Sequence, residues 1–545
     1  MRLRPFALLA TLLAVGASLE ACSNLLITKG ASKDGSTMIT YAADSHELYG
    51  ELYFKHGGQH LPQEMRDIIE WDTGKLLGRI PEAPVTYTRV GNMNEHQVAI
   101  AETTFGGRKE LQVPSGIVDY GSLIYIALER AKTAREAIDV MTRLAETYGY
   151  ASEGESFSIA DPNEAWILEM IGKGKGQTGA LWVAYRLPDG TISAHANQSR
   201  IRTFPQNDPD TARYSKDLIP FAREHGYFKG ADKDFSFADA YAPLSFGALR
   251  FCEARVWSLF RRAAPSLNLS IAYVKAEKGA KPMPLYIKPD QKLGVRDAME
   301  LMRDHFEGTE FDMSKDVGAG PFALPYRWRP MTWKVDGKEY LHERALSTQQ
   351  TGFSFVAQAR ANLPAPIGGV LWFGVDDTAS TVYVPIYAGV LRAPKAFAEG
   401  TGDFKTFTWE SAFWVFNAVA NFAYSRYRDM IVDIRRVQRD LEGSFLARQP
   451  EIERHALVLH KQSPESAREY LTRYSEEQTR RTVDRWRQLL PELLLKYLDG
   501  NVRDEHGKPT HPGYPKGWYR RIVKERGEHL RVRKLKNELP EEELH

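Results

Sequence analysis

The chain has 545 residues, of which 26% are charged and 43% hydrophobic, and this is the composition of an ordinary globular protein. Its 72 basic and 70 acidic residues leave a formal net charge of +2, which gives no indication of nucleic-acid binding. The length allows one large domain or two to three smaller ones. Beyond the first twenty residues no apolar run approaches the roughly 18 residues of a membrane helix, so we predict no integral membrane span.

The first 21 residues have the pattern of a secretory signal peptide. Arg2 and Arg4 supply the positive start, and residues 6–17 form the apolar core. Ala21 is a small residue at the position before a cleavage site. We therefore predict an exported protein, periplasmic or secreted from a bacterium, whose mature chain begins with Cys22.

The sequence contains two cysteines, Cys22 and Cys252. A bridge between them is one interpretation, because exported proteins tolerate disulfides. We favour a free Cys22, since a thiol at a mature N-terminus is exposed and reactive.

From Cys22 onward the sequence predicts short strands. Segments 24–28 and 37–41 flank a turn at 33–36 and give a hairpin signal. Further strands are predicted at 51–54, 85–90, 97–102, 156–160, 165–170, 181–185, 191–196, 353–359, 369–374 and 381–386. Residues 174–179 match GxGxxG, but a strand follows instead of a helix, so the segment is predicted to be a hairpin turn and not a dinucleotide site.

Helical periodicity predicts helices at 119–148, 254–263 and 295–306, and then a long helix at 409–441 with an aromatic stripe. We predict an α+β domain at 22–408, a helical extension at 409–530 packed on it, and a charged tail at 531–545. The stripe at 413–422 is interpreted as core packing.

A cysteine at a mature N-terminus carries a complete catalytic pair. Its α-amine has an ordinary pKa near 8, so it can accept the thiol proton at working pH. The thiolate then attacks a carbonyl carbon to form an acyl-enzyme. Such a site also needs an acid to orient the amine and donors that hold the oxyanion.

Residues 22–45 (CSNLLITKGASKDGSTMITYAADS) combine a terminal cysteine, an ASxDGS motif, and an acidic residue followed by serine. This opening resembles the dipeptidase family of N-terminal-nucleophile (Ntn) cysteine hydrolases, which includes lactobacillal dipeptidase A and is related to the secernins. The resemblance covers about residues 22–441. Further matching segments are 94–95, 102–104, 182–186, 196–197, 306–309 with 312, 370–372, 383–385 and 414–417.

The resemblance implies an αββα four-layer sandwich with a C-terminal helical extension. It also implies roles for particular residues. Asp44 matches the acid near the end of the second strand, Asn197 matches an asparagine that holds the oxyanion or the amine, and Asn94 is a weaker match. Many members carry Arg and Asn just before the acid, where this chain has Tyr41-Ala42-Ala43. Arg255 or Arg200 is a candidate replacement for the missing basic neighbour.

Each of these residues also has a structural interpretation. Asp44 could end a strand in a turn, and Asn197 could satisfy backbone groups in one. Asn94 could cap or turn the loop before the strand at 97–102. Arg255 could lie on the solvated face of its helix.

Two other functions compete with a dipeptidase. Residues 19–22 resemble a lipobox, and lipidation of Cys22 would block both catalytic groups and leave a membrane-tethered, non-enzymatic lipoprotein. Glu20 argues against this, because that position normally holds a small or apolar residue. The second alternative is an acylase that hydrolyses N-acyl amides on the same scaffold.

A dipeptidase must bind the free amine of its substrate, so a carboxylate is expected near the nucleophile, and Glu95 or Glu102 could serve. The sequence contains no HExxH, paired CxxC or GxSxG motif. We predict no metal and no cofactor, and we predict dipeptides or short peptides as substrates. The oligomeric state is left open, and a homo-oligomer is one possibility.

Overall fold

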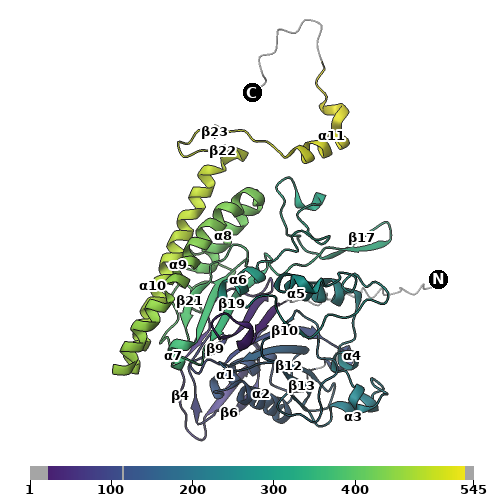
Figure 1. The fold of residues 1–545 in the computed structure, drawn as a ribbon, viewed down its shortest axis with the longest axis vertical. Coiled ribbons are helices and arrows are strands. Elements are labelled where there is room, and N and C mark those ends of the chain that lie inside the picture. Colours follow the sequence, from purple (N-terminus) through teal and green to yellow (C-terminus); the bar gives the residue numbers. More distant parts are fainter. Residues whose placement is uncertain (1–21, 113, 115, 534–545) are drawn as a thin grey trace, which may run out of the picture.

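The computed structural model describes residues 22–112, 114 and 116–533. Within them the chain forms two large antiparallel sheets with helices, and this confirms the predicted α+β class (Figure 1). In spatial order the seven-stranded sheet consists of β16 (Tyr286–Ile287), β14 (Ile192–His195), β1 (Asn24–Ile27), β2 (Thr37–Asp44), β19 (Thr351–Ala359), β20 (Val370–Val375) and β21 (Val384–Tyr387). The eight-stranded sheet consists of β15 (Ala212–Tyr214), β13 (Ala180–Arg186), β12 (Ala165–Gly172), β11 (Gly154–Ala160), β10 (Ala99–Gly106), β9 (Met93–Asn94), β8 (Arg89–Val90) and β3 (Phe54–Lys55).

The two sheets face each other, and helices cover their outer faces. Helices α1 (Tyr120–Arg130) and α2 (Ala134–Tyr148) pack on the eight-stranded sheet. Helices α5 (Ala254–Ala263) and α6 (Val295–Met302) pack on the seven-stranded sheet. Every residue of β2, β11, β12 and β19 is buried, because both faces of these strands are covered.

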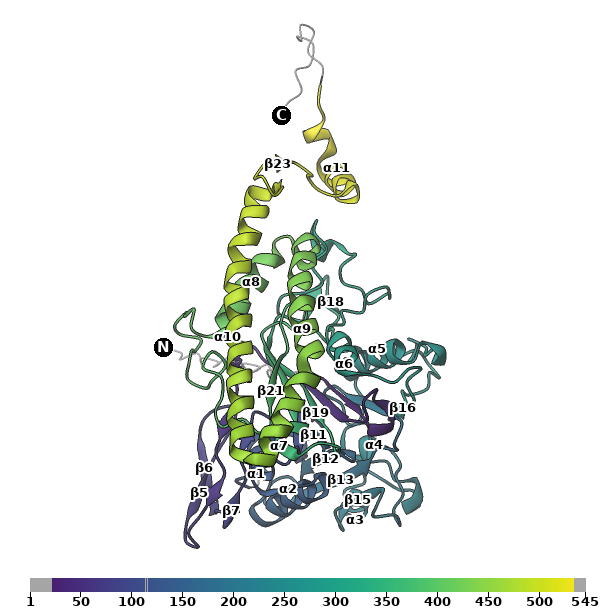
Figure 2. The ribbon, with the colours of Figure 1, turned by 60° about the vertical axis from the view of Figure 1, so that its left-hand side comes forward.

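Three long helices extend the outer layer of the seven-stranded sheet: α8 (Ala412–Tyr424), α9 (Tyr427–Gln462) and α10 (Pro464–Lys496). They run side by side past β20 and β21, and their buried residues belong to the same core as the strands (Figure 2). Helix α11 (Lys516–Leu530) projects beyond them and contains no buried residue. No helix in the described part of the chain is long and apolar enough to cross a membrane.

The remaining elements lie around these layers. They are the helices α3 (Leu218–Glu224), α4 (Phe237–Tyr241) and α7 (Ala365–Gly368) and the small hairpins β4 (Gly58–Gln59) with β7 (Val85–Thr86), β5 (Met65–Ile69) with β6 (Leu76–Pro81), β17 (Thr332–Val335) with β18 (Lys338–Leu341) and β22 (Val502–Arg503) with β23 (Pro509–Thr510).

Several local predictions are confirmed. β1 and β2 form the predicted antiparallel hairpin, and the Gly-rich segment 174–179 is the turn between β12 and β13. Two predicted helices were wrong in extent, since each is divided in two. α1 ends and α2 begins around Thr133, whose side chain caps α2 by accepting from the N–H of Glu136 at 3.2 Å. α8 and α9 are separated at Arg426, whose φ of −145° is not helical. The predicted signal peptide lies outside the described residues, as does most of the predicted charged tail.

His195 links the facing surfaces of the two sheets. It lies on β14, and its two ring nitrogens are hydrogen-bonded at 2.7 Å to the hydroxyls of Thr103 on β10 and Ser158 on β11. The ring is completely buried. Burial and, to a smaller extent, the positive charge of Arg200 lower the pKa of His195 to about 3, so the imidazole is neutral in the folded protein.

This link predicts a specific pH dependence of stability. The unfolded chain protonates His195 near pH 6.5, whereas the folded protein does not do so until about pH 3, so its stabilising contribution is full above pH 6.5 and falls as the pH is lowered. From this group alone, the free energy of unfolding should fall by about 1.4 kcal/mol for each pH unit between pH 6 and pH 4. His195→Gln should remove this part of the slope in urea unfolding curves.

The control is His506→Gln, because the His506 side chain is 82% exposed. Equal pH slopes for the wild-type protein and His195→Gln would contradict the assignment.

Candidate active site

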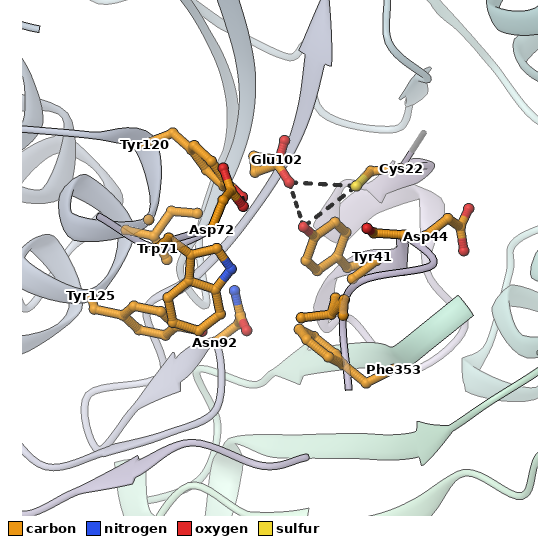
Figure 3. Close-up of a pocket in the computed structure, with 15 residues that line it drawn as sticks. Cys22, Tyr41, Asp44, Trp71, Asp72, Asn92, Glu102, Tyr120, Tyr125 and Phe353 are labelled. Carbon is orange, nitrogen blue, oxygen red and sulfur yellow. Dashed lines mark hydrogen bonds between the residues drawn. The ribbon is translucent and has the colours of Figure 1, made fainter. Parts of the chain in front are cut away.

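Cys22 lies two residues before the start of β1 and is only 6% exposed. Its Sγ is 3.6 Å from the hydroxyl of Tyr41 on β2 and 3.5 Å from Oε1 of Glu102 on β10 (Figure 3). The Tyr41 hydroxyl also donates to the same Glu102 oxygen. Cys22 is not disulfide-bonded, and neither is Cys252. The thiol is therefore free and stands between strands of both sheets.

The surroundings of Cys22 disfavour the thiolate. Burial raises the pKa of Cys22 well above its usual range, and the negative charges of Glu102 and Asp44 raise it further. The main-chain N–H of Asp44 opposes this effect by hydrogen bonding to the sulfur, and the contact with the Tyr41 hydroxyl also lowers the pKa of Cys22. With the Cys22 nitrogen held in a peptide bond to Ala21, the thiol is protonated at neutral pH. A nearby positive charge is needed to make it a nucleophile.

Asp44 is at the end of β2 and is completely buried. Arg344 lies 3.1 Å from its Oδ2, and the Thr351 hydroxyl donates to its Oδ1 at 2.6 Å. Burial raises the pKa of Asp44, and Arg344 and Thr351 oppose this rise. Asp44 lines the same cavity as Cys22, and its negative charge acts on the thiol.

Arg255 connects Cys22 to Asn197. From α5 its guanidinium donates to the carbonyl oxygen of Cys22 at 2.6 Å, to Oγ of Ser23 at 2.7 Å and to Oδ1 of Asn197 at 2.9 Å. Arg255 is fully buried and not on a solvated helix face. Burial and the neighbouring Arg344 lower the pKa of Arg255 to about 10, which leaves it protonated at neutral pH.

Asn197 follows β14 with a φ of 60°, the left-handed region that asparagine tolerates better than most residues. Its Nδ2 donates to the carbonyl oxygen of Thr104 on β10 at 2.7 Å. Arg200 is directed elsewhere, to Glu253 at 3.0 Å and to the carbonyl oxygen of Ala194 at 2.7 Å. Of the two candidate arginines, the structure thus brings Arg255 to the nucleophile and leaves Arg200 away from it.

Asn94 and Glu95 are not brought to the cysteine. The Asn94 amide donates at 2.7 Å to the carbonyl oxygens of Leu128 and Ala131, so it caps the end of α1, where carbonyls lack helical partners. Glu95 forms an ion pair with Arg468 of α10 at 2.9 Å. Neither residue lines the cavity beside Cys22.

The cavity beside Cys22 is narrow, with a volume of ≈ 30 Å³ open to the centre of a water-sized group. Figure 3 shows Cys22 and Asp44 on one side and Trp71 and Asp72 on the other. The lining residues are Cys22, Tyr41, Ala43, Asp44, Ser45, Leu48, Trp71, Asp72, Asn92, Glu102, Tyr120, Gly121, Ile124, Tyr125 and Phe353. Sequence reasoning missed Tyr41, Asp72 and the aromatic wall. Tyr41 lies within the motif at residues 22–45, whereas no sequence pattern indicated that the other residues would line the cavity.

Glu102 belongs to a buried carboxyl pair. Burial and the charge of Glu102 raise the pKa of Glu155 on β11 well above its usual range, so Glu155 is protonated and donates to Glu102. The Thr104 hydroxyl donates to Glu155 at 2.8 Å. Within the described residues, no cluster of three or more His, Cys, Asp or Glu side chains is arranged to hold a metal ion.

The proximity of Glu102 to the sulfur leads to a measurable prediction. Glu102→Gln removes a negative charge that raises the thiol pKa, so the pH midpoint for alkylation of Cys22 by iodoacetamide should fall by about one unit. The measurement needs a Cys252→Ser background, in which Cys22 is the remaining thiol. Glu95→Gln is the matched control and should leave the midpoint unchanged. An unchanged midpoint in Glu102→Gln would show that Glu102 does not act on the thiol.

Comparison with known proteins supports a peptidase. The sequence model of peptidase family C69 matches residues 21–440. A probable dipeptidase of Latilactobacillus sakei is 25% identical over 75% of this chain and 82% of its own length. A probable dipeptidase of Salmonella dublin is 25% identical over 70% and 83%, and probable dipeptidase B of Streptococcus pyogenes serotype M1 is 21% identical over 87% and 93%. The match begins at the residue before Cys22 and covers both sheets and α8, so this chain belongs to peptidase family C69.

Proposed function

We propose that the protein is an exported cysteine dipeptidase whose nucleophile is Cys22 at the N-terminus of the mature chain. The observation that carries this proposal is the position of the thiol. The first residue after a leader-like segment lies buried in a cavity with Asp44 and is held there by Arg255. The similarity to probable dipeptidases favours peptides as substrates.

Cleavage between Ala21 and Cys22 converts a peptide nitrogen into an α-amine. The amine accepts the thiol proton, and the resulting ammonium offsets the carboxylates that disfavour the thiolate. The thiolate then attacks the peptide carbonyl carbon, and the tetrahedral intermediate expels the leaving amine, which takes the proton from the ammonium. Water hydrolyses the thioester in the second half of the reaction, with the amine again as base, and restores the free thiol.

The surrounding residues have separate roles in this scheme. Arg255 is a positioning residue, because it holds the Cys22 carbonyl oxygen. Asp44 is suited to orient the ammonium. Its main-chain N–H reaches the sulfur, so it is also placed near the oxyanion that forms beside it. Asn197, fixed by Arg255, borders the same region.

The arrangement of layers supports an N-terminal-nucleophile hydrolase with an αββα sandwich. In this interpretation the nucleophile precedes the first strand of one sheet, and the second sheet faces it. Here β1 begins two residues after Cys22, and Glu102 contacts Cys22 from β10 of the opposite sheet. The inward position of the sulfur also argues against a lipoprotein, because a diacylglyceryl group has no room in a cavity of this size.

The reaction predicts a clear order among cysteine variants. Cys22→Ala should lower kcat/KM for alanyl-alanine by about a thousand-fold or more, since the nucleophile is lost. Cys22→Ser should retain little activity, because the hydroxyl is a weaker nucleophile. Cys252→Ser is the matched control and should stay within about twofold of the wild-type protein. Full activity in Cys22→Ala would exclude the mechanism.

Maturation can be tested independently of activity. Intact mass spectrometry and N-terminal sequencing of protein from an exporting bacterial host should give a chain that begins at an unmodified Cys22. Ala21→Glu should block the cleavage, because the site requires a small residue. A mass increase that corresponds to a lipid on Cys22 would contradict the proposal and show a membrane-tethered protein.

A further inference from the structure

The cavity beside Cys22 carries an unusual charge pattern. Its lining includes the carboxyl groups of Asp44, Asp72 and Glu102 but no Lys, Arg or His side chain. Five aromatic rings complete the walls, those of Tyr41, Trp71, Tyr120, Tyr125 and Phe353. Carboxylates combined with aromatic faces are the surroundings that a small organic cation prefers.

Two of the three carboxyl groups have roles within the nucleophile's surroundings. Asp44 is paired with Arg344, and Glu102 accepts hydrogen bonds from the Cys22 thiol and Tyr41. Asp72 is different, since its Oδ1 accepts one hydrogen bond from the Tyr120 hydroxyl at 2.8 Å. Among the described residues, no Lys, Arg or His side chain lines the cavity beside it. Asp72 is thus the carboxylate available to a cation that enters the cavity.

Asp72 is held rigidly at this position. It lies in the turn between β5 and β6, next to Trp71. The main-chain N–H of Trp71 donates at 2.9 Å to the carboxylate of Asp119, which precedes α1. The Trp71 ring packs at 4.8 Å from that of Tyr125. Gly121 permits this approach, because a Cβ there would lie 2.6 Å from the Cβ of Trp71. The turn is therefore fixed to α1 and faces Cys22 across the cavity (Figure 3).

The electrostatics around Asp72 agree with this geometry. Asp72 is an exposed residue, yet desolvation by the surrounding protein raises its pKa, and the negative charges of Asp119, Glu70 and Glu47 raise it further. The hydrogen bond from Tyr120 opposes the rise. A site of net negative potential gains most from a bound cation.

We propose that Asp72, against the aromatic wall of Trp71 and Tyr125, binds the α-ammonium group of the substrate's N-terminal residue. This inference rests on the proposed function, because it places the substrate relative to Cys22. The ammonium is two bonds from the scissile carbonyl carbon and is small enough for a cavity that admits water-sized groups. An N-acylated substrate has no such cation, so the site selects free peptides over N-acyl amides.

The opposite side of the nucleophile has the opposite charge. A second cavity of ≈ 480 Å³ is lined by Arg255, Arg329 and Arg344. Arg255 contacts Cys22 and Arg344 contacts Asp44, so positive charges border the nucleophile on this side. A dipeptide with its ammonium toward Asp72 would place its carboxylate in the positive potential of this side, although the Arg255 guanidinium itself is already fully hydrogen-bonded within the protein. This polarity fixes one orientation of a zwitterionic substrate.

The test compares alanyl-alanine with propionyl-alanine, which differs by the missing amino group. The wild-type protein should prefer alanyl-alanine by at least 100-fold in kcat/KM. Asp72→Asn should reduce kcat/KM for alanyl-alanine by 10- to 100-fold, mainly through KM, and should leave propionyl-alanine within about twofold. Asp72→Glu should recover part of the loss. The matched control is Asp67→Asn on the same hairpin, where the carboxylate is half exposed and paired with Arg79.

Binding gives a readout that does not depend on turnover. In a Cys22→Ala background, calorimetry should show at least tenfold weaker binding of alanyl-alanine when Asp72 is also changed to Asn. If the wild-type protein hydrolyses alanyl-alanine but Asp72→Asn is unchanged in both measurements, this inference is overturned while the dipeptidase stands. If the wild-type protein hydrolyses neither compound nor other dipeptides, the proposed function itself fails. Equal hydrolysis of both compounds by the wild-type protein would point to an acylase and also overturn the inference.

Discussion

The hydrogen bonds of the Arg255 guanidinium are the interaction on which the site depends. A buried guanidinium is stable only if its donors find partners, because its desolvation costs several kcal/mol. Here its acceptors are the carbonyl oxygens of Cys22, Ala196 and Phe251, Oγ of Ser23 and Oδ1 of Asn197. Because most of these acceptors lie just before β1 and just after β14, the hydrogen bonds of one guanidinium join α5 to both strands. The same bonds hold the backbone of Cys22 in place.

The second constraint is the negative charge around the thiol. Asp44 and Glu102 raise the pKa of Cys22, and no cation lines the cavity to offset them. A free α-amine would be the missing cation, placed by the chain itself on the reacting residue. In the proposed mechanism one cleavage both exposes the site and supplies its base, so the uncleaved chain would be held inactive by electrostatics as well as by its leader.

The parts of this arrangement that were predicted from sequence are local in the chain. The β1–β2 hairpin follows from alternating strands about a turn, and it carries Cys22 and Asp44 to one place by their spacing. Arg255 was recognised as a candidate, but its burial depends on acceptors up to 233 residues away. Asn94 and Glu95 were candidates because they lie close to Glu102 in the sequence. In the structure, however, Glu95 pairs with Arg468 of α10, and Asn94 donates to a carbonyl oxygen of α1.

Asp72 shows why specificity is harder to predict than chemistry. Its hairpin has no pattern that links it to Cys22, and the link is made by α1 through Trp71, Tyr120 and Gly121. The residues proposed to act in catalysis lie just before β1, on β2 and at the start of α5, where a shift would disturb the core of both sheets. The β5–β6 hairpin is a separate two-stranded unit at the edge of this core. If Asp72 binds the substrate ammonium as proposed, substitutions in this hairpin would change which substrates are bound and leave the residues around Cys22 in place.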